Sequence, residues 1–136
     1  MKEGEALPVV EKLITQNGIN RYAAASGDFN PIHVDHEFAR TSQFRSTIAH
    51  GMMIAATISE MMTLSFGSPW RETGTMKIRF RLPVYPEDII TTTGEVDKIT
   101  ELKNHRQFHC SVNIVNQDGK TVISGNTSVT VPDKNS

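Results

Sequence analysis

The chain has 136 residues, a formal net charge of -1, and a composition of 38% hydrophobic and 21% charged residues. This length fits one domain with one hydrophobic core, and the composition is that of an ordinary globular protein. A charge so close to zero gives no electrostatic basis for binding nucleic acid or an anionic membrane surface, so we expect neither partner.

The apolar segments predict neither a membrane span nor an export signal. The longest of them, residues 48–66, contains His50, Ser59 and Glu60 and is too polar to cross a bilayer. The first residues of the chain carry charges on both sides of a very short apolar patch, unlike a signal peptide. The one cysteine, Cys110, excludes an internal disulfide and a thiolate metal cluster. These features favour a cytoplasmic protein.

Two helices are predicted in the first half of the chain. Residues 19–27 hold good helix formers and end at Gly27, which suits a helix C-cap. Residues 50–67 form a longer helix that ends at Gly67, and its apolar residues surround most of its circumference. A helix that is apolar on most sides is expected to be buried on most sides.

Between these helices lies a loop whose polar residues are unusual for a plain connection. Pro31 fixes its own φ and pushes Asn30 into an extended conformation, while the side chains of Asp28 and Asn30 can bond to the backbone and lock the turn. Asp28 and His33 then converge on one small volume, where a carboxylate and an imidazole can hold a water and move its proton. The residues also fit an ordinary turn, with a surface His33 ahead of a short helix capped by Asp35.

The start of the long helix holds a second group of candidate residues. Gly51 leaves an unpaired backbone N–H there, and the helix dipole adds partial positive charge. Such a donor suits a carbonyl oxygen that gains charge in a transition state, although Gly51 also fits a tight helix start. His50 is expected to be structural. Ser59 lies on an otherwise apolar helix and, if buried, must bond to its own helix or to a loop side chain such as Asp28.

The second half of the chain predicts an antiparallel sheet. Residues alternate with a period of two or favour strands in four runs joined by turns, namely 75–82, 88–102, 105–116 and 120–131. Gly119 occupies a hairpin turn that needs positive φ, and Gly125 is interpreted as a bulge or bend. Cys110 fits a small buried hydrophobe better than a nucleophile. A sheet wrapped around one buried helix is therefore predicted, an α+β fold.

Two motifs of this chain resemble a known family. The run Asp28-Phe29-Asn30-Pro31-Ile32-His33, followed by Ile48-Ala49-His50-Gly51-Met52-Met53, is similar to the signature of the MaoC-like (R)-specific enoyl-CoA hydratases, or hydratase 2. The resemblance extends from about residue 6 to residue 132. It implies a single hotdog domain over residues 1–136, an antiparallel sheet wrapped around a long central helix. It also implies a homodimer whose sheets join edge to edge.

The resemblance further implies a lyase reaction of fatty acid metabolism. Water adds reversibly, in the syn sense, to the double bond of a trans-2-enoyl thioester of coenzyme A or acyl carrier protein, and the product is an (R)-3-hydroxyacyl thioester. By position, Asp28 matches the residue that activates the water, and His33 matches its partner. Gly51 matches the donor to the thioester oxygen, Asn30 a structural residue, and Ser59 a support for the aspartate. Coenzyme A enters as part of the substrate, and neither a cofactor nor a metal is expected.

Two other functions stay open at this point. Hotdog proteins include acyl-thioesterases, which would be expected to place a carboxylate on the long helix, and here that helix offers Glu60. The chain could also be a non-catalytic partner subunit of a heteromeric acyl-thioester dehydratase, although intact Asp28 and His33 argue against an inert copy. The sequence does not specify the acyl chain length, the carrier or the direction of flux.

Overall fold

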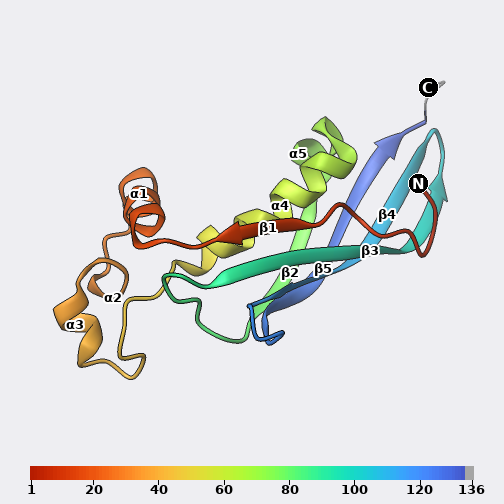
Figure 1. Ribbon diagram of the computed structural model, residues 1–136. Coiled ribbons are helices and arrows are strands. Elements are labelled where there is room, and N and C mark those ends of the chain that lie inside the picture. Colours follow the sequence, from red (N-terminus) through yellow and green to blue (C-terminus); the bar gives the residue numbers. More distant parts are fainter. Residues whose placement is uncertain (134–136) are drawn as a thin grey trace.

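The computed structural model describes residues 1–133, which form five strands and five helices (Figure 1). In chain order these are β1 (Val10–Leu13), α1 (Gln16–Ser26), α2 (Pro31–Val34), α3 (His36–Arg40), α4 (Gly51–Phe66), α5 (Ser68–Thr73), β2 (Thr75–Phe80), β3 (Ile89–Leu102), β4 (His105–Val115) and β5 (Thr121–Pro132).

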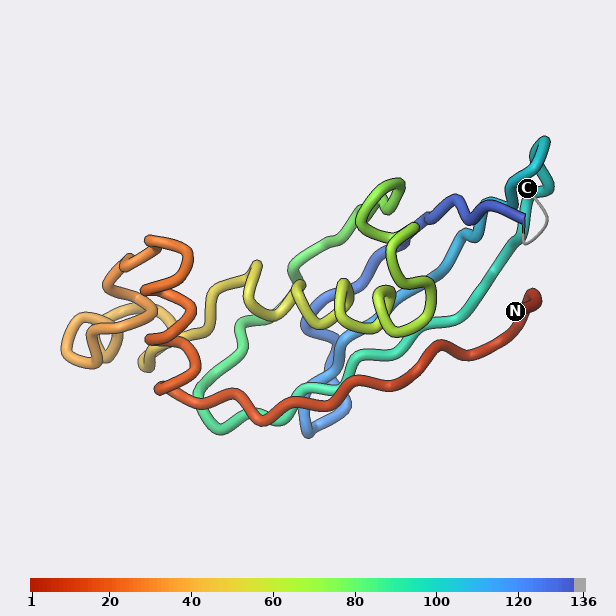
Figure 2. Tube along the Cα trace, turned by 90° about the horizontal axis from the view of Figure 1, so that it is seen from above, coloured from red at the N-terminus to blue at the C-terminus, as the bar shows by residue number. Residues whose placement is uncertain are grey.

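The strands form one sheet in the order β1-β3-β4-β5-β2, and every neighbouring pair is antiparallel. β1 and β2 therefore lie at the two edges. Helix α4 runs along one face of this sheet, as the view from above shows (Figure 2). The predicted α+β architecture, a sheet wrapped around a long helix, is confirmed.

The core lies between α4 and the sheet. The helix buries Ile54, Ile58, Met61 and Met62, and the sheet contributes fully or almost fully buried side chains, namely Ile90, Val96, Phe108, Ile114, Ile123 and Val129. Thr57 of α4 is also buried and shares a 2.7 Å hydrogen bond with the Thr92 hydroxyl of β3. The Thr57 hydroxyl donates to the Ile54 carbonyl at 2.7 Å and therefore accepts from Thr92, which gives the buried Thr92 hydroxyl a partner.

The expectation that α4 is buried on most sides is wrong for a single chain. Met52 and Leu64 of this helix are exposed. The sheet lies on only one side of α4 (Figure 2). The apolar residues on the other side of the helix are therefore left uncovered by the sheet in the single chain. Exposed apolar side chains of this kind mark a surface available for contact with another molecule.

Three elements were not predicted from the sequence: β1, α5 and the one-turn helix α2, which forms within the expected loop. β1 is a four-residue edge strand paired with β3, too short to produce a recognisable alternation. Residues 68–73, for which the sequence predicted no element, form helix α5, and its Trp70 is buried in the core.

The interpretation of Gly125 as a bulge is also wrong. Gly125 pairs in regular register with Ile78 of β2, and the irregularity between β4 and β5 lies at Ile114 and Val115. A Cβ at Gly125 would fall onto the Lys77 carbonyl oxygen and lie 2.8 Å from the Ile78 Cα. Glycine is needed here because the two backbones approach closely.

Helices α1, α2 and α3 lie beyond the end of the sheet, next to the start of α4 (Figures 1 and 2). No helix within the described residues is long and apolar enough to cross a membrane. The candidate catalytic loop belongs to the α1–α3 segment, so the site lies at the junction between this segment and the layer of sheet and α4.

Candidate active site

The loop that carries Asp28 is locked by its own side chains, as predicted. Helix α1 ends at Gly27, whose φ of 79° is left-handed and whose N–H donates to the Ala23 carbonyl. The Asp28 Oδ1 then accepts from the Asn30 N–H at 3.2 Å, and the Asn30 Oδ1 accepts from the Ile32 N–H at 3.2 Å. Asn30 caps α2 and is therefore a structural residue of the loop.

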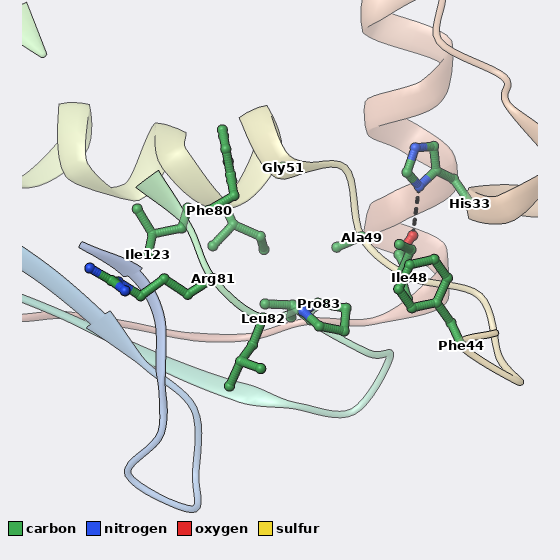
Figure 3. Close-up of a pocket in the computed structure, with 12 residues that line it drawn as sticks. His33, Phe44, Ile48, Ala49, Gly51, Phe80, Arg81, Leu82, Pro83 and Ile123 are labelled. Atoms are coloured by element: carbon green, nitrogen blue, oxygen red, sulfur yellow. Dashed lines mark hydrogen bonds between the residues drawn. The ribbon is translucent and has the colours of Figure 1, made fainter. Parts of the chain in front are cut away.

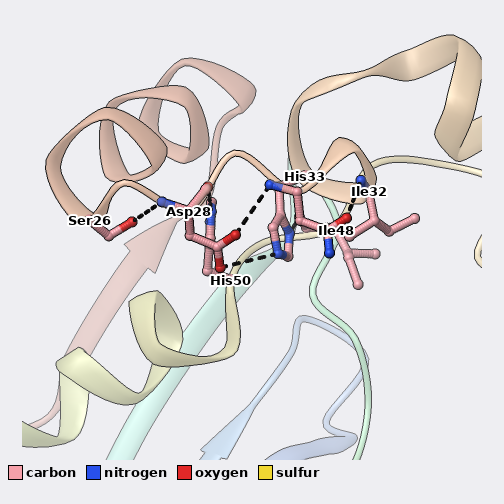
Figure 4. Close-up of polar contacts among 7 residues, drawn as sticks. Ser26, Asp28, Ile32, His33, Ile48 and His50 are labelled. Carbon is pink, nitrogen blue, oxygen red and sulfur yellow. Dashed lines mark hydrogen bonds and ion pairs between the residues drawn. The ribbon is translucent and has the colours of Figure 1, made fainter.

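His33 and Asp28 face each other across the loop (Figure 4). The His33 Nδ1 lies 2.8 Å from the Ile48 carbonyl oxygen, which can only accept, so the Nδ1 carries the proton. The His33 Nε2 then points toward the Asp28 Oδ2 at 4.0 Å. That distance is too long for a direct hydrogen bond and leaves room for one water that bonds to both atoms. The His33 side chain is 12% exposed and that of Asp28 is 53% exposed, so solvent reaches the pair from the Asp28 side.

His50 also belongs to this site, which the sequence did not predict. Its ring stacks on the His33 ring, with centroids 3.8 Å apart and planes 25° apart. Its Nε2 donates to the Asp28 carbonyl oxygen at 2.9 Å. The Tyr22 ring packs against it at a tilt, with ring centroids 4.8 Å apart. His50 is only 3% exposed. In the sequence, the position of His50 directly before Gly51 was the feature that could have indicated this, but His50 was interpreted as a structural residue.

Gly51 is the first residue of α4, so its N–H is one of the donors that a helix start leaves unpaired within the helix. The ring of Phe80, at the end of β2, lies against this glycine: a Cβ at Gly51 would be 2.8 Å from the nearest ring carbon. The structure thus brings Asp28, His33 and Gly51 to one place, as predicted.

Two cavities of about 320 Å³ each meet at this place, and both are lined by His33, Gly51 and Phe80. The first continues among apolar side chains, which include Phe44, Ile48, Ile54, Leu82, Val84 and Ile123 (Figure 3). The second is lined by the side chains of the acid–base site, Asp28, His33 and His50, and by Tyr22, Ser26 and Met52. A reacting group at Gly51 would therefore have an apolar chamber on one side and the acid–base pair on the other.

Gln16 fastens the catalytic loop to its surroundings and was not singled out in the sequence. Its Nε2 donates to the His33 carbonyl oxygen at 2.9 Å, and its Oε1 accepts from the buried Thr47 hydroxyl at 2.6 Å. One amide therefore connects the start of α1, the catalytic loop and the segment that leads to α4.

Ser59 does not lie at this site in the single chain. It lines a separate groove along α4 together with Lys12, Met53 and Glu60. Within one chain, Ser59 therefore does not provide the support for Asp28 that the resemblance implies. Instead, His50 donates a hydrogen bond to the main chain of Asp28. Glu60 forms an exposed 3.2 Å ion pair with Lys12 in the same groove, so the carboxylate considered for a thioesterase lies outside the two cavities described above.

The ligand atoms of Asp28, His33 and His50 lie within 4.8 Å of one another and could in principle hold a metal ion. The ring geometry argues against this. Stacked imidazoles hold their lone pairs in nearly parallel planes, whereas a metal needs lone pairs that converge on one point. The cluster suits proton transfer better than metal binding.

Cys110 is buried in β4, as predicted. Burial raises the pKa of its thiol to about 11, a hydrogen bond with Thr127 acts in the opposite direction, and the charge of Asp97 adds to the rise. A thiol held in its neutral form is a poor nucleophile.

The chain is similar to known proteins over almost its whole length. The model of the MaoC like domain family matches residues 3–118. An (R)-specific enoyl-CoA hydratase of Rhodospirillum rubrum is 32% identical over 132 residues, which cover 97% of this chain and 89% of the relative. A 3-hydroxybutyryl-CoA dehydratase of Methylorubrum extorquens is 28% identical over 126 residues, which cover 93% of this chain and 78% of the relative.

Among solved structures, an unliganded R-hydratase from Pseudomonas aeruginosa superposes with a TM-score of 0.84 at 29% identity, covering 98% of this chain and 84% of that one. The similarity extends over the sheet, the long helix and the segment that carries the catalytic loop.

Proposed function

The chain belongs to the MaoC-like domain family and has its hotdog fold, and we propose that it is an (R)-specific enoyl-CoA hydratase, a hydro-lyase that also catalyses the reverse dehydration of 3-hydroxyacyl-CoA. The substrate is a trans-2-enoyl thioester and the second reactant is water. Coenzyme A belongs to the substrate, and the reaction needs no further cofactor.

One observation carries this proposal: the facing Asp28 and His33, 4.0 Å apart, lie beside the first N–H of α4 at Gly51. Addition of water at C3 of an enoyl thioester needs a group that takes a proton from the water and a donor for the charge that reaches the thioester oxygen. The two requirements act on opposite ends of one conjugated system. The site offers both within one pocket.

The roles follow from the geometry. A water between the Asp28 carboxylate and the His33 Nε2 loses a proton to this pair as its oxygen bonds to C3. The electron pair of the double bond moves toward the thioester oxygen, where the Gly51 N–H stabilises the developing charge. A proton from the same pair then goes to C2. Because both proton-transferring groups lie on one side of the substrate, the addition is syn. The apolar cavity next to Gly51 takes the acyl chain.

The test is the loss of the enoyl-thioester absorbance when the purified chain is mixed with crotonyl-CoA. Wild type should remove this band without releasing free thiol, and Asp28→Asn should react about 100- to 10,000-fold more slowly. Glu60→Gln is the matched control, since this carboxylate lies in the separate groove along α4, and it should react like wild type. If wild type released free thiol and Glu60→Gln did not, the proposed hydratase function would be wrong and the chain would be a thioesterase.

We further propose that the active form is a homodimer. β2 is an edge strand, and Phe80 and Leu82 at its end are 54% and 44% exposed. An unpaired edge with exposed apolar side chains is a site for pairing with a second copy. Light scattering on the purified chain should give twice the monomer mass, and hydration by that sample alone would exclude a need for a different partner subunit.

A further inference from the structure

We infer that His50 is a positioning residue that holds Asp28 and His33 in register with Gly51. The inference rests on the proposed hydration at this site and adds to it a residue that acts through Asp28 and His33. It follows from the contacts of one imidazole ring, from the way α4 begins, and from a buried nitrogen that lacks a hydrogen-bond partner within residues 1–133.

The His50 ring contacts both members of the acid–base pair in different ways (Figure 4). Its Nε2–H donates to the main-chain carbonyl of Asp28 at 2.9 Å, which restrains the residue that carries the carboxylate. Its face stacks on His33 with centroids 3.8 Å apart, which restrains the plane of that ring. His33 has a second anchor at the Ile48 carbonyl, and Asp28 is also held by bonds with Ser26 and Asn30, both of which lie within two residues of it in the same loop. The hydrogen bond from His50 is the one that joins Asp28 to the residue that begins α4.

The place of His50 in the chain connects these restraints to the oxyanion donor. His50 is the residue directly before Gly51, and its carbonyl accepts from the N–H groups of Met53 and Ile54 in the first turn of α4. The main chain of His50 is thus part of the helix start, while its side chain contacts the catalytic loop at Asp28 and His33. His50 therefore joins the catalytic loop directly to the first turn of α4.

Two features of His50 are unfavourable for the stability of the fold and indicate that the residue has another role. His50 occupies the N-cap of α4, yet its side chain makes no capping hydrogen bond. Asn, Asp, Ser and Thr are the residues that cap a helix start. In addition, the His50 Nδ1 is buried and has no hydrogen-bond partner among the described residues. Burying an unpaired polar atom is unfavourable, and such an atom in a native structure needs an explanation. Positioning of the catalytic loop supplies one.

A positioning role has a defined kinetic consequence. Loss of alignment between catalytic groups raises the transition-state barrier with little effect on ground-state binding, so kcat falls while KM stays nearly constant. A role in stabilising the helix start would instead lower the melting temperature. Loss of folded protein would then lower the apparent kcat only, and kcat calculated per folded protein would stay near the wild-type value.

His50→Asn and His50→Gln form a matched pair that separates these roles. The amide nitrogen of Asn reaches only as far as the imidazole Nδ1, whereas that of Gln reaches as far as the Nε2 and can still donate to the Asp28 carbonyl. Asn is also a favoured N-cap residue, so His50→Asn should melt at the wild-type temperature or above it. We expect His50→Asn to lower kcat for crotonyl-CoA hydration about 10- to 100-fold, with KM within about threefold of wild type. His50→Gln should recover most of this loss.

The inference is overturned if folded His50→Asn keeps kcat within about threefold of wild type, or if His50→Gln is as impaired as His50→Asn. A combined fall in melting temperature and kcat in both variants would assign His50 a structural role. Nitrogen-15 NMR of the imidazoles gives a readout that does not need turnover. Wild type should show His50 protonated on Nε2 and His33 on Nδ1, and His50→Asn should shift the His33 signals. If wild type hydrates no thioester, the proposed function fails, and these spectra still decide whether His50 holds the loop.

Discussion

Replacement of Gly51 by alanine should impair catalysis without destabilising the protein. A methyl group at this position would lie 2.8, 3.2 and 3.3 Å from three carbons of the Phe80 ring, which are its three nearest neighbours. The ring would have to retreat by about 0.6 to 1 Å to reach ordinary contact. Phe80 is 54% exposed, so it can move, and replacing glycine by alanine at a compatible backbone conformation stabilises a protein by about 0.4 to 1 kcal/mol. The free energy of unfolding should therefore stay equal or rise.

The displaced ring lines both cavities that meet at Gly51, so the reactive part of the substrate loses its position. We expect kcat/KM for crotonyl-CoA to fall about 10- to 100-fold in Gly51→Ala, because small misplacements at a reacting centre have effects of this size. A double-mutant cycle with Phe80→Leu tests the cause. If the ring contact is responsible, Gly51→Ala should cost at least about tenfold less in the Phe80→Leu background. Equal losses in both backgrounds would refute this explanation.

Two further substitutions and one titration test the surrounding structure. Gly125→Ala should lose more than about 3 kcal/mol of unfolding free energy, because its methyl meets the β2 backbone, whereas Gly94→Ala should lose about 1 to 2 kcal/mol, because its methyl meets the flexible ends of Met61 and Leu7 first. Urea unfolding followed by the fluorescence of the single, buried Trp70 measures both, and equal losses would contradict the comparison. The folded-state pKa of Cys110 is raised from 9.0 to about 11, so the stability that its neutral thiol contributes is complete below pH 9 and is lost as the pH rises through 11. Between about pH 8 and about pH 10.5, wild type should therefore lose about 1 to 2 kcal/mol more than Cys110→Val, and identical pH sensitivity would count against the buried thiol.

The parts of this structure that follow local rules were predictable from the sequence. Gly27 ends α1 in the left-handed conformation, and Asn30 bonds to the backbone as its side chain allows. The alternation of Met76 and Ile78 with charged residues predicted β2, although not its place at the edge of the sheet. These features depend on a few neighbouring residues, so their signals are present in a short stretch of sequence.

The parts that were not predicted depend on contacts between distant segments. His50 contacts Asp28 through a hydrogen bond and His33 through a ring stack, and Gln16 bonds to residues 33 and 47. None of these contacts leaves a periodic or local pattern. Gly125 was misinterpreted for the same reason, since the strand that excludes a side chain there lies more than forty positions away in the sequence. Which residues of α4 stay exposed likewise depends on how much of the helix the sheet covers, and the helix sequence does not specify this.

Both imidazoles of the site are anchored to main-chain carbonyl oxygens, those of Ile48 and Asp28. A main-chain carbonyl is supplied by every amino acid. The protonated nitrogen of His33 is therefore insensitive to the identity of residue 48, which can vary in size to reshape the apolar chamber it lines. Changes that adapt the chamber to longer or branched acyl chains can thus accumulate at this position without disturbing proton transfer. Ile48 thus contributes its side chain to the shape of the chamber and its backbone carbonyl to the orientation of His33, so that the first can change without the second.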